Sequence, residues 1–153
     1  MSRIKKIMVA IAFSKYSQAI LDYGLSMATS LGAEVVVANV IHSRDVEAVG
    51  RIQNMGYKVD PDEYIQGVKA ERQAVLETMI KDTSFPAEKL KTISKVGHPS
   101  DKLIQIIEEE GIDLVVMGAK GRTDLPHALL GSVAQKLFRH SPVPVLSYRD
   151  KGQ

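Results

Sequence analysis

A glycine-rich segment from Gly118 to Ser132 contains the residues of this 153-residue chain that are best suited to ligand chemistry. It follows a strand-like run, residues 113–117, and leads into a helical pattern. Glycine lets backbone N–H groups approach a ligand closely, and the first turn of a helix offers unpaired N–H donors with a partial positive charge. Gly118, Gly121 and Gly131, next to the helix start, therefore predict a site for phosphate groups.

Three side chains in this segment are candidate phosphate contacts. Lys120 and Arg122 carry charges that pair with phosphate oxygens, and Ser132 either caps the helix or donates its hydroxyl to a phosphate. Two plainer interpretations stay open, because exposed basic side chains are often only solvated and a glycine-rich loop can be a turn without a ligand. The chain contains neither G-x-x-x-x-G-K-S/T nor G-x-G-x-x-G, so the standard phosphate-loop and dinucleotide fingerprints do not apply.

The strands that position this segment are predicted from their apolar residues. Nearly continuous apolar runs are typical of a parallel sheet whose faces are both covered by helices, and they occur at residues 7–12, 35–41 and 113–117. Residues 92–96 alternate between apolar and polar, as an outer strand does. Residues 143–146 complete a set of five strands, and Pro144 predicts an edge position for the last one.

Helical periodicity alternates with these strands. It predicts helices over about residues 15–31, 62–79, 99–111 and 132–140. Right-handed crossovers between parallel strands then place helices on both faces of the sheet. The predicted fold class is α/β, a doubly wound open five-stranded parallel sheet, formed by a single domain over residues 1–153. Such sheets bind ligands beyond the carboxyl ends of their strands, where the winding direction reverses.

One connection, residues 42–61, is longer than is usual between two elements of a compact domain. It is polar and contains Gly50, Gly56 and Pro61. Two interpretations are open: a mobile flap over the site, or a surface excursion with a short helix around residues 46–52.

Composition and residue spacing exclude several function classes. The chain has no cysteine, which excludes disulfides and thiol nucleophiles, and its net charge of +2 with 5% aromatic residues does not indicate a nucleic-acid binder. No apolar run reaches the length of a membrane span and no signal peptide fits the N-terminus, so we expect a cytoplasmic protein. The four histidines lack metal-ligand spacing, and we assign no metal site and no catalytic residue. His42 and His98 could both face the cleft, although a structural role is the simpler expectation for each.

The glycine-rich segment resembles the universal stress protein family. Members of that family that bind ATP carry the pattern G-x2-G-x9-G-S/T, and this chain matches its fixed positions with Gly118, Gly121, Gly131 and Ser132. Further likenesses cover effectively the whole chain, at residues 7–17, 96–99 and 141–145. The resemblance implies a Rossmann-like fold of the adenine nucleotide alpha hydrolase-like type.

The resemblance also implies a nucleotide site and roles for particular residues. The Val40 backbone would meet adenine, while Ala10, Ile11, Ala12 and Met117 would wall the nucleoside. The glycine motif, with Ser132 and Val133, would hold the phosphates. The family typically has an acidic residue where this chain has Ala12, which removes a polar contact and possible help with a metal ion, together with a repulsive charge near the phosphates.

These features together predict an ATP-binding stress-response module, with magnesium as a possible companion ion and little or no turnover. The resemblance further implies a homodimer that pairs the edge strand at residues 143–148. One alternative is a dimeric interaction protein of the same fold that binds no nucleotide. A second alternative, a phosphotransferase or nucleotide hydrolase, has the least support, because no general base is evident near the site.

Overall fold

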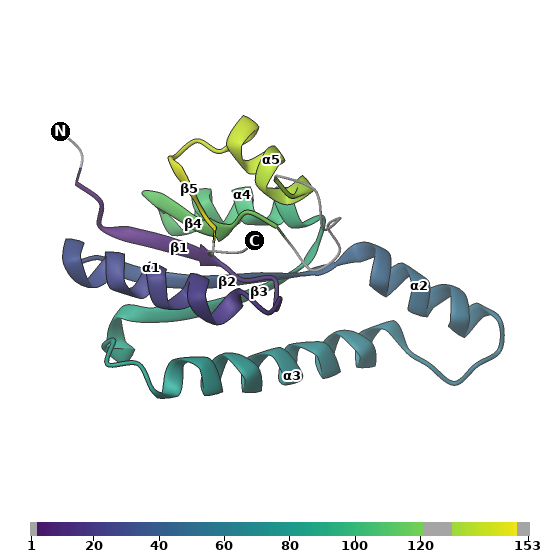
Figure 1. Cartoon of the computed structure of the whole chain (residues 1–153). Helices are drawn as coiled ribbons and strands as arrows, with labels where there is room; N and C mark the ends of the chain where they lie inside the picture. Colours follow the sequence, from purple (N-terminus) through teal and green to yellow (C-terminus); the bar gives the residue numbers. More distant parts are fainter. Residues whose placement is uncertain (1–2, 121–129, 150–153) are drawn as a thin grey trace.

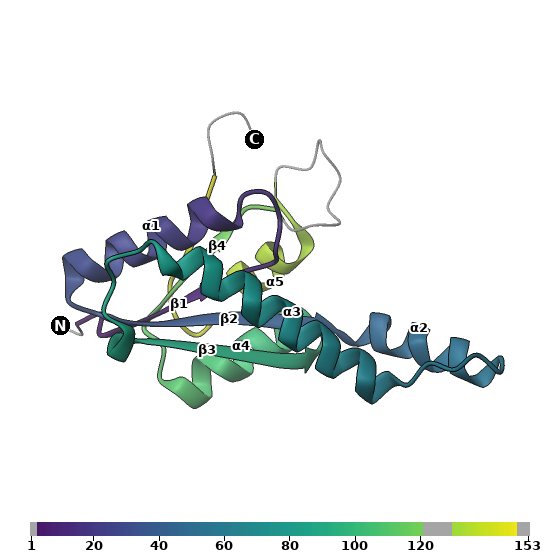
Figure 2. The ribbon, with the colours of Figure 1, turned by 90° about the horizontal axis from the view of Figure 1, so that it is seen from below.

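The structure is a computed structural model that describes residues 3–120 and 130–149 (Figures 1 and 2). The elements follow in the order β1 (Lys6–Ala10), α1 (Ser17–Leu31), β2 (Glu34–His42), α2 (Ser43–Asn54), α3 (Pro61–Lys81), a 3-10 turn (Ala87–Lys89), β3 (Leu90–Gly97), α4 (Pro99–Glu110), β4 (Leu114–Gly118), α5 (Ser132–His140) and β5 (Val145–Tyr148). In the described part of the chain, no helix combines the length and apolarity needed to cross a membrane.

The five strands form one parallel sheet in the order β3-β2-β1-β4-β5. From β1 the chain winds outward through β2 to β3, and it then returns to the other side of β1 to form β4 and β5. The winding direction therefore reverses between β1 and β4, which pair side by side. This arrangement confirms the predicted doubly wound fold, with β3 and β5 at the two edges as expected.

Helices cover both faces of the sheet, which explains the nearly continuous apolar strands. Alternate residues of a strand point to opposite faces. Ile7 and Val9 of β1 pack in one core with α1 and with Leu76 of α3, whereas Met8 packs in a second core with α4 and α5. Figure 1 shows α1 and α3 on one side of the sheet and α4 and α5 on the other.

Two glycines let α1 lie unusually close to the sheet. A Cβ atom added at Gly24 would overlap the Val9 side chain of β1. A Cβ at Gly118 would lie 2.7 Å from Ile20 Cδ1, so a side chain at the end of β4 would require the end of the Ile20 side chain to move. The φ of Gly118 is not in the left-handed region, so its backbone conformation does not call for glycine, whereas its close approach to Ile20 favours one. This close packing holds the loop between β1 and α1 at the carboxyl end of the sheet.

The long connection after β2 contains α2. The sequence predicted a short helix around residues 46–52, and the structure has a helix there that is longer, with 12 residues. His42, the last residue of β2, is the N-cap of α2, because its Nδ1 accepts a hydrogen bond of 3.2 Å from the Arg44 N–H. Asp60 caps α3 in the same way, with Pro61 in the first turn. Figures 1 and 2 show α2 and the start of α3 projecting beyond the sheet.

The last strand begins at Val145, so the prediction that it starts at residue 143 is wrong by two residues. Ser141 explains the difference, because its hydroxyl oxygen accepts from the Val143 N–H at 3.2 Å and donates to the Val143 carbonyl at 2.7 Å, which bends the chain into a turn. Pro144 still lies beside β4, where its carbonyl accepts from the Val115 N–H. The strand itself follows once N–H donors are available again.

Candidate functional site

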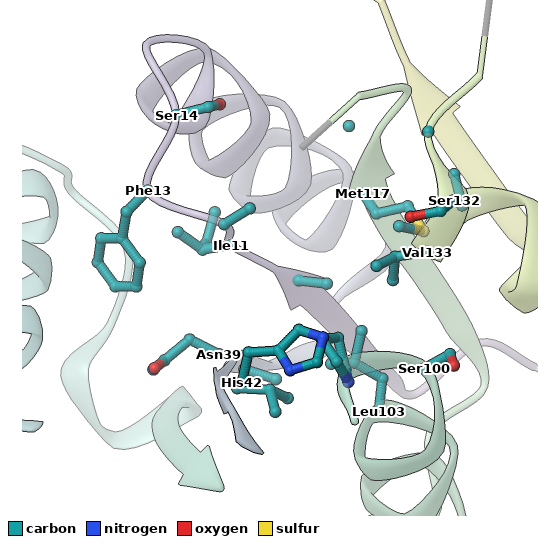
Figure 3. A pocket seen from close by; sticks show the side chains of 18 of the residues that line it. Ile11, Phe13, Ser14, Asn39, His42, Ser100, Leu103, Met117, Ser132 and Val133 are labelled. Atoms are coloured by element: carbon teal, nitrogen blue, oxygen red, sulfur yellow. The ribbon is translucent and has the colours of Figure 1, made fainter. Parts of the chain in front are cut away.

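A cleft of about 1000 Å³ opens at the carboxyl ends of β1, β2 and β4, where the winding reverses (Figure 3). Ten of the twelve residues that the sequence singled out line this cleft: Ala10, Ile11, Ala12, Val40, Met117, Gly118, Lys120, Gly131, Ser132 and Val133. The other two, Gly121 and Arg122, lie outside the described residues. Residues from both ends of the chain therefore meet in one cavity.

The N-terminus of α5 forms one end of the cleft. Gly131 is the N-cap residue, and a glycine has no side chain with which to cap the helix. The first N–H groups of a helix have no carbonyl partner within it, and they carry the positive end of the helix dipole. Ser132 and Val133, the first two residues of α5, line the cleft, and Lys120 adds a positive side chain at the same end.

The backbone N–H of Gly131 is engaged within the protein. The Gly131 N–H donates to the Ala119 carbonyl at 2.6 Å, which joins the end of β4 to the start of α5. Its φ of −71° is also outside the left-handed region, so flexibility is not its role. Gly131 lines the cleft immediately before the first turn of α5.

The walls between the strand ends are apolar. Ile11 is 4% exposed and Met117 is 6% exposed, and both carry side chains that line the cleft. Ala12 is exposed at the same wall and presents only a methyl group. After Ala12 the chain turns sharply at Phe13, whose φ of 56° is unusual for a residue with a side chain.

A polar network that the sequence analysis missed closes the cleft on the side of α3. Arg72 Nη1 donates to the Val40 carbonyl at 3.1 Å and to Asn39 Oδ1 at 3.3 Å. The same oxygen of Asn39 accepts from the Ser94 hydroxyl at 3.2 Å, and the guanidinium of Arg72 stacks 5.0 Å from the centre of the Phe13 ring. One side chain of α3 thus ties together β2 and the loop after β1.

Two histidines mark the far end of the cleft, near the ends of β2 and β3. His42 and His98 both line it, with ring centres 5.7 Å apart in an edge-on arrangement. Burial lowers the pKa of His42 below its ordinary value, and the nearby charges of Arg44 and His98 lower it further, while Asp45 and Glu47 oppose the shift. His42 therefore favours the neutral form, which suits its role as a hydrogen-bond acceptor for α2.

A doubly wound parallel sheet, with a cleft at the winding switch and the start of a helix in that cleft, defines an α/β protein of the Rossmann-like class. The chain belongs to the universal stress protein family, because the sequence model of that family matches residues 3–149.

Two curated relatives match nearly the whole chain. The universal stress protein MJ0577 of Methanocaldococcus jannaschii is 28% identical over 155 residues, which cover 96% of each protein. Its solved structure has a TM-score of 0.81 and covers 99% of this chain and all of the other. The universal stress protein YxiE of Bacillus subtilis is 28% identical over 94% of this chain and 98% of its own length.

More distant structures share the fold. A universal stress protein solved in complex with cAMP has a TM-score of 0.62 and 21% identity, and covers 97% of this chain and 98% of that one. The universal stress protein of Archaeoglobus fulgidus, solved in complex with dAMP, has a TM-score of 0.58 and 17% identity, with coverage of 97% and 100%.

Proposed function

We propose that this protein binds an adenine nucleotide, with ATP as its cofactor, and acts in the cytoplasm as a nucleotide-responsive stress module with little or no turnover. The observation that carries the proposal is the N-terminus of α5, with a glycine as its N-cap residue, which shares one cleft with the apolar strand ends. A cleft with apolar walls and a few donors at one end suits a nucleoside joined to phosphates. Two proteins of the same fold were solved with cAMP and with dAMP, which agrees with this ligand class.

In this proposal, each part of the cleft contacts a different part of the nucleotide. The Val40 backbone meets the base, and Ala10, Ile11, Ala12 and Met117 wall the nucleoside. The phosphates lie against the first turn of α5, where Gly118, Gly131, Ser132, Val133 and Lys120 are the proposed binding residues. Gly121 and Arg122 complete the proposed set, although they lie outside the described residues.

Magnesium would be coordinated mainly by the bound nucleotide and not by protein side chains. In residues 3–120 and 130–149 no group of three or more His, Asp or Glu side chains could hold a metal ion, and Ala12 supplies no carboxylate. Magnesium usually keeps several water ligands and binds phosphate oxygens, so ATP itself would supply its main contacts. The bound ion would offset phosphate charge. The protein would contribute the fixed donors of α5 and a cleft that limits access of water.

A thermal unfolding titration with ATP and magnesium tests the proposal. At a ligand concentration about 100 times the dissociation constant, binding stabilises the native state by about 2.7 kcal/mol. For a chain of this size, that corresponds to a rise in Tm of roughly 5–10 °C. No rise at millimolar nucleotide would contradict the proposal and favour the alternative, a dimeric interaction protein that binds no nucleotide.

Gly131→Ala provides the matched variant. A methyl group at the approach to α5 obstructs the phosphates, but the extended backbone at this residue accepts alanine without strain. We expect the variant to lose most of the ATP-dependent rise in Tm. Gly67→Ala is the control, because this exposed glycine of α3 has open space around it and should keep the full ATP response.

We also propose a homodimer that pairs residues 143–148 of two copies. β5 lies at a sheet edge, and its residues Val145–Tyr148 are only partly buried in the isolated chain. A free strand edge presents unpaired N–H and C=O groups, which a second copy can pair across a two-fold axis.

A further inference from the structure

The strand β2 continues past the end of β1, and the backbone of Val40 faces the cleft there. β1 pairs with β2 as far as Ala10 and Ala38, and the Ile11 N–H donates to the Ala38 carbonyl at 2.9 Å. Alternate residues of a parallel strand direct their N–H and C=O groups to the same side, so those of Val40 point the same way as those of Ala38. Among the described residues, β1 supplies no strand partner for Val40 on this side.

The Val40 carbonyl is occupied by a side chain of the protein itself. Arg72 Nη1 donates to this carbonyl at 3.1 Å and to Asn39 Oδ1 at 3.3 Å. Asn39 is 3% exposed, and its Oδ1 also accepts from the Ser94 hydroxyl at 3.2 Å. In the proposed function, the Val40 backbone meets the base of the nucleotide. A guanidinium therefore lies at the oxygen to which that base would donate.

Phe13 holds the Arg72 guanidinium from the loop after β1. Its ring centre lies 5.0 Å from the guanidinium, a distance typical of a cation–π contact. Both side chains line the cleft, and Figure 3 shows Phe13 on the same side of it as Asn39. The φ of Phe13, 56°, is unfavourable for a residue with a bulky side chain. Such a conformation persists only where surrounding contacts hold it, so the loss of the Arg72 contact would also free this turn.

The helix α3 is anchored to the sheet by few buried side chains. Of its 21 residues, only Leu76 is buried by the described part of the chain. Arg72 lies one helical turn before Leu76, and its hydrogen bond to Val40 joins the middle of α3 to the end of β2. The start of α3 projects beyond the sheet together with α2 (Figure 2). A change at Arg72 therefore acts on the helix that leads to this projection.

We infer that Arg72 is a positioning residue that couples the base end of the cleft to α3. The amino group of an adenine base and the Arg72 guanidinium are both hydrogen-bond donors, and both are directed at the Val40 carbonyl. Two donors at one oxygen repel each other, because their hydrogens carry positive charge and one of the groups is a full cation. A base that donates to Val40 therefore displaces Arg72 and loosens the middle of α3. The inference rests on the proposed function, because it requires the base to lie against Val40.

Hydrogen–deuterium exchange of the full chain tests the inference with two probes, ATP and purine riboside 5′-triphosphate, which lacks the amino group. The exchange rates of the backbone amides in residues 65–76 are measured, and isothermal titration calorimetry gives the affinity for each probe. We expect ATP to raise these rates about 5-fold to 10-fold, which corresponds to the loss of one hydrogen bond of about 1–1.4 kcal/mol. The analogue should bind without raising them.

Arg72→Met removes the competing donor and keeps a long side chain with high helix propensity. Asn39 Oδ1 keeps the Ser94 hydroxyl as a donor, so this buried acceptor still has a partner. We expect the variant to bind ATP about 10-fold more tightly, with fast exchange in residues 65–76 before ATP is added. Lys69→Met is the matched control, because it removes a positive charge from the same helix, outside the described lining of the cleft. It should behave as the wild type in both measurements.

The outcomes separate this inference from the proposed function. Binding of neither probe by the wild type overturns the proposed function and the inference with it. Binding of both probes with the same exchange rates in residues 65–76 overturns the coupling and leaves the nucleotide site intact. Equal or weaker binding of ATP by Arg72→Met also overturns the inference, because Arg72 then does not compete with the base. Circular dichroism of both variants shows that they are folded.

Discussion

At the scale of single residues, His42 joins the sheet to the projecting helices. Its backbone ends β2, while its ring accepts the hydrogen bond that starts α2. Protonation of the ring removes that acceptor and places a positive charge at the positive end of a helix dipole. The local structure at the far end of the cleft is therefore sensitive to the charge state of one imidazole.

We predict that His42 makes the free energy of unfolding depend on pH. Its pKa in the folded protein is lowered from 6.5, so as the pH falls through this value the unfolded chain takes up the proton first. Stability is then lost between about pH 7.5 and the lowered pKa, and the loss is complete below it. Urea denaturation at several pH values measures the effect.

The matched variant is His42→Asn, because asparagine caps a helix equally well but does not titrate. The difference in unfolding free energy between the two proteins should stay constant above about pH 7.5 and shift against the wild type below pH 6.5. The other histidines are present in both proteins and cancel in this difference. A difference that stays flat across the whole range would contradict the prediction.

The sequence predicted the cleft residues that belong to continuous patterns, and missed the ones that depend on tertiary contacts. Met117 and Gly118 could be predicted because an apolar strand pattern ends at a glycine. Ser132 could be predicted because a helical pattern starts there. The contact of Arg72 with Asn39 joins residues 33 positions apart, and no spacing rule connects them. The polar Asn39 within an apolar strand was the available signal, because a buried amide needs a partner.

At the scale of elements, the packing of α1 on β1 depends on Gly24. We predict that Gly24→Ala destabilises the protein by about 1–3 kcal/mol, because the added methyl group overlaps Val9 in a filled core. The same substitution at Gly67, in an exposed turn of α3, should stabilise it by about 0.5–1 kcal/mol through helix propensity alone.

Urea denaturation of the two alanine variants and the wild type measures both effects in one experiment. A stabilising effect of Gly24→Ala would show that α1 can move away from the sheet without cost. Equal effects at the two positions would mean that propensity, and not close packing, decides the role of Gly24.

The helix boundaries show where local sequence patterns are enough to predict the structure and where they are not. The helix of residues 132–140 was predicted to the residue, because apolar periodicity and a preceding glycine mark its ends. The helix of residues 43–54 was only partly predicted, since it has no buried residue and its start depends on a histidine cap, which is less common than Ser, Thr, Asp or Asn. Its contacts with α3 support it instead.

At the scale of the whole molecule, the free edge of β5 decides how two copies could pair. The carbonyls of Pro144 and Tyr148 accept hydrogen bonds from the N–H groups of Val115 and Ala119, at the beginning and just after the end of β4. Since the N–H and C=O of one strand residue point to the same side, the missing N–H of Pro144 also faces β4. Pro144 therefore removes no N–H from the outer edge, and the outward groups belong to Val145 and Ser147.

This geometry gives a sharp test of the proposed homodimer. Ser147→Pro removes an outward N–H without removing a bond to β4, and proline is tolerated on an edge strand. We predict that the wild type has the mass of two chains by light scattering at micromolar concentration, and that Ser147→Pro shifts it toward a monomer. Ser147→Ala keeps the N–H and should remain dimeric. A wild-type protein with the mass of one chain would refute the dimer, and a dimeric Ser147→Pro variant would move the interface away from this edge.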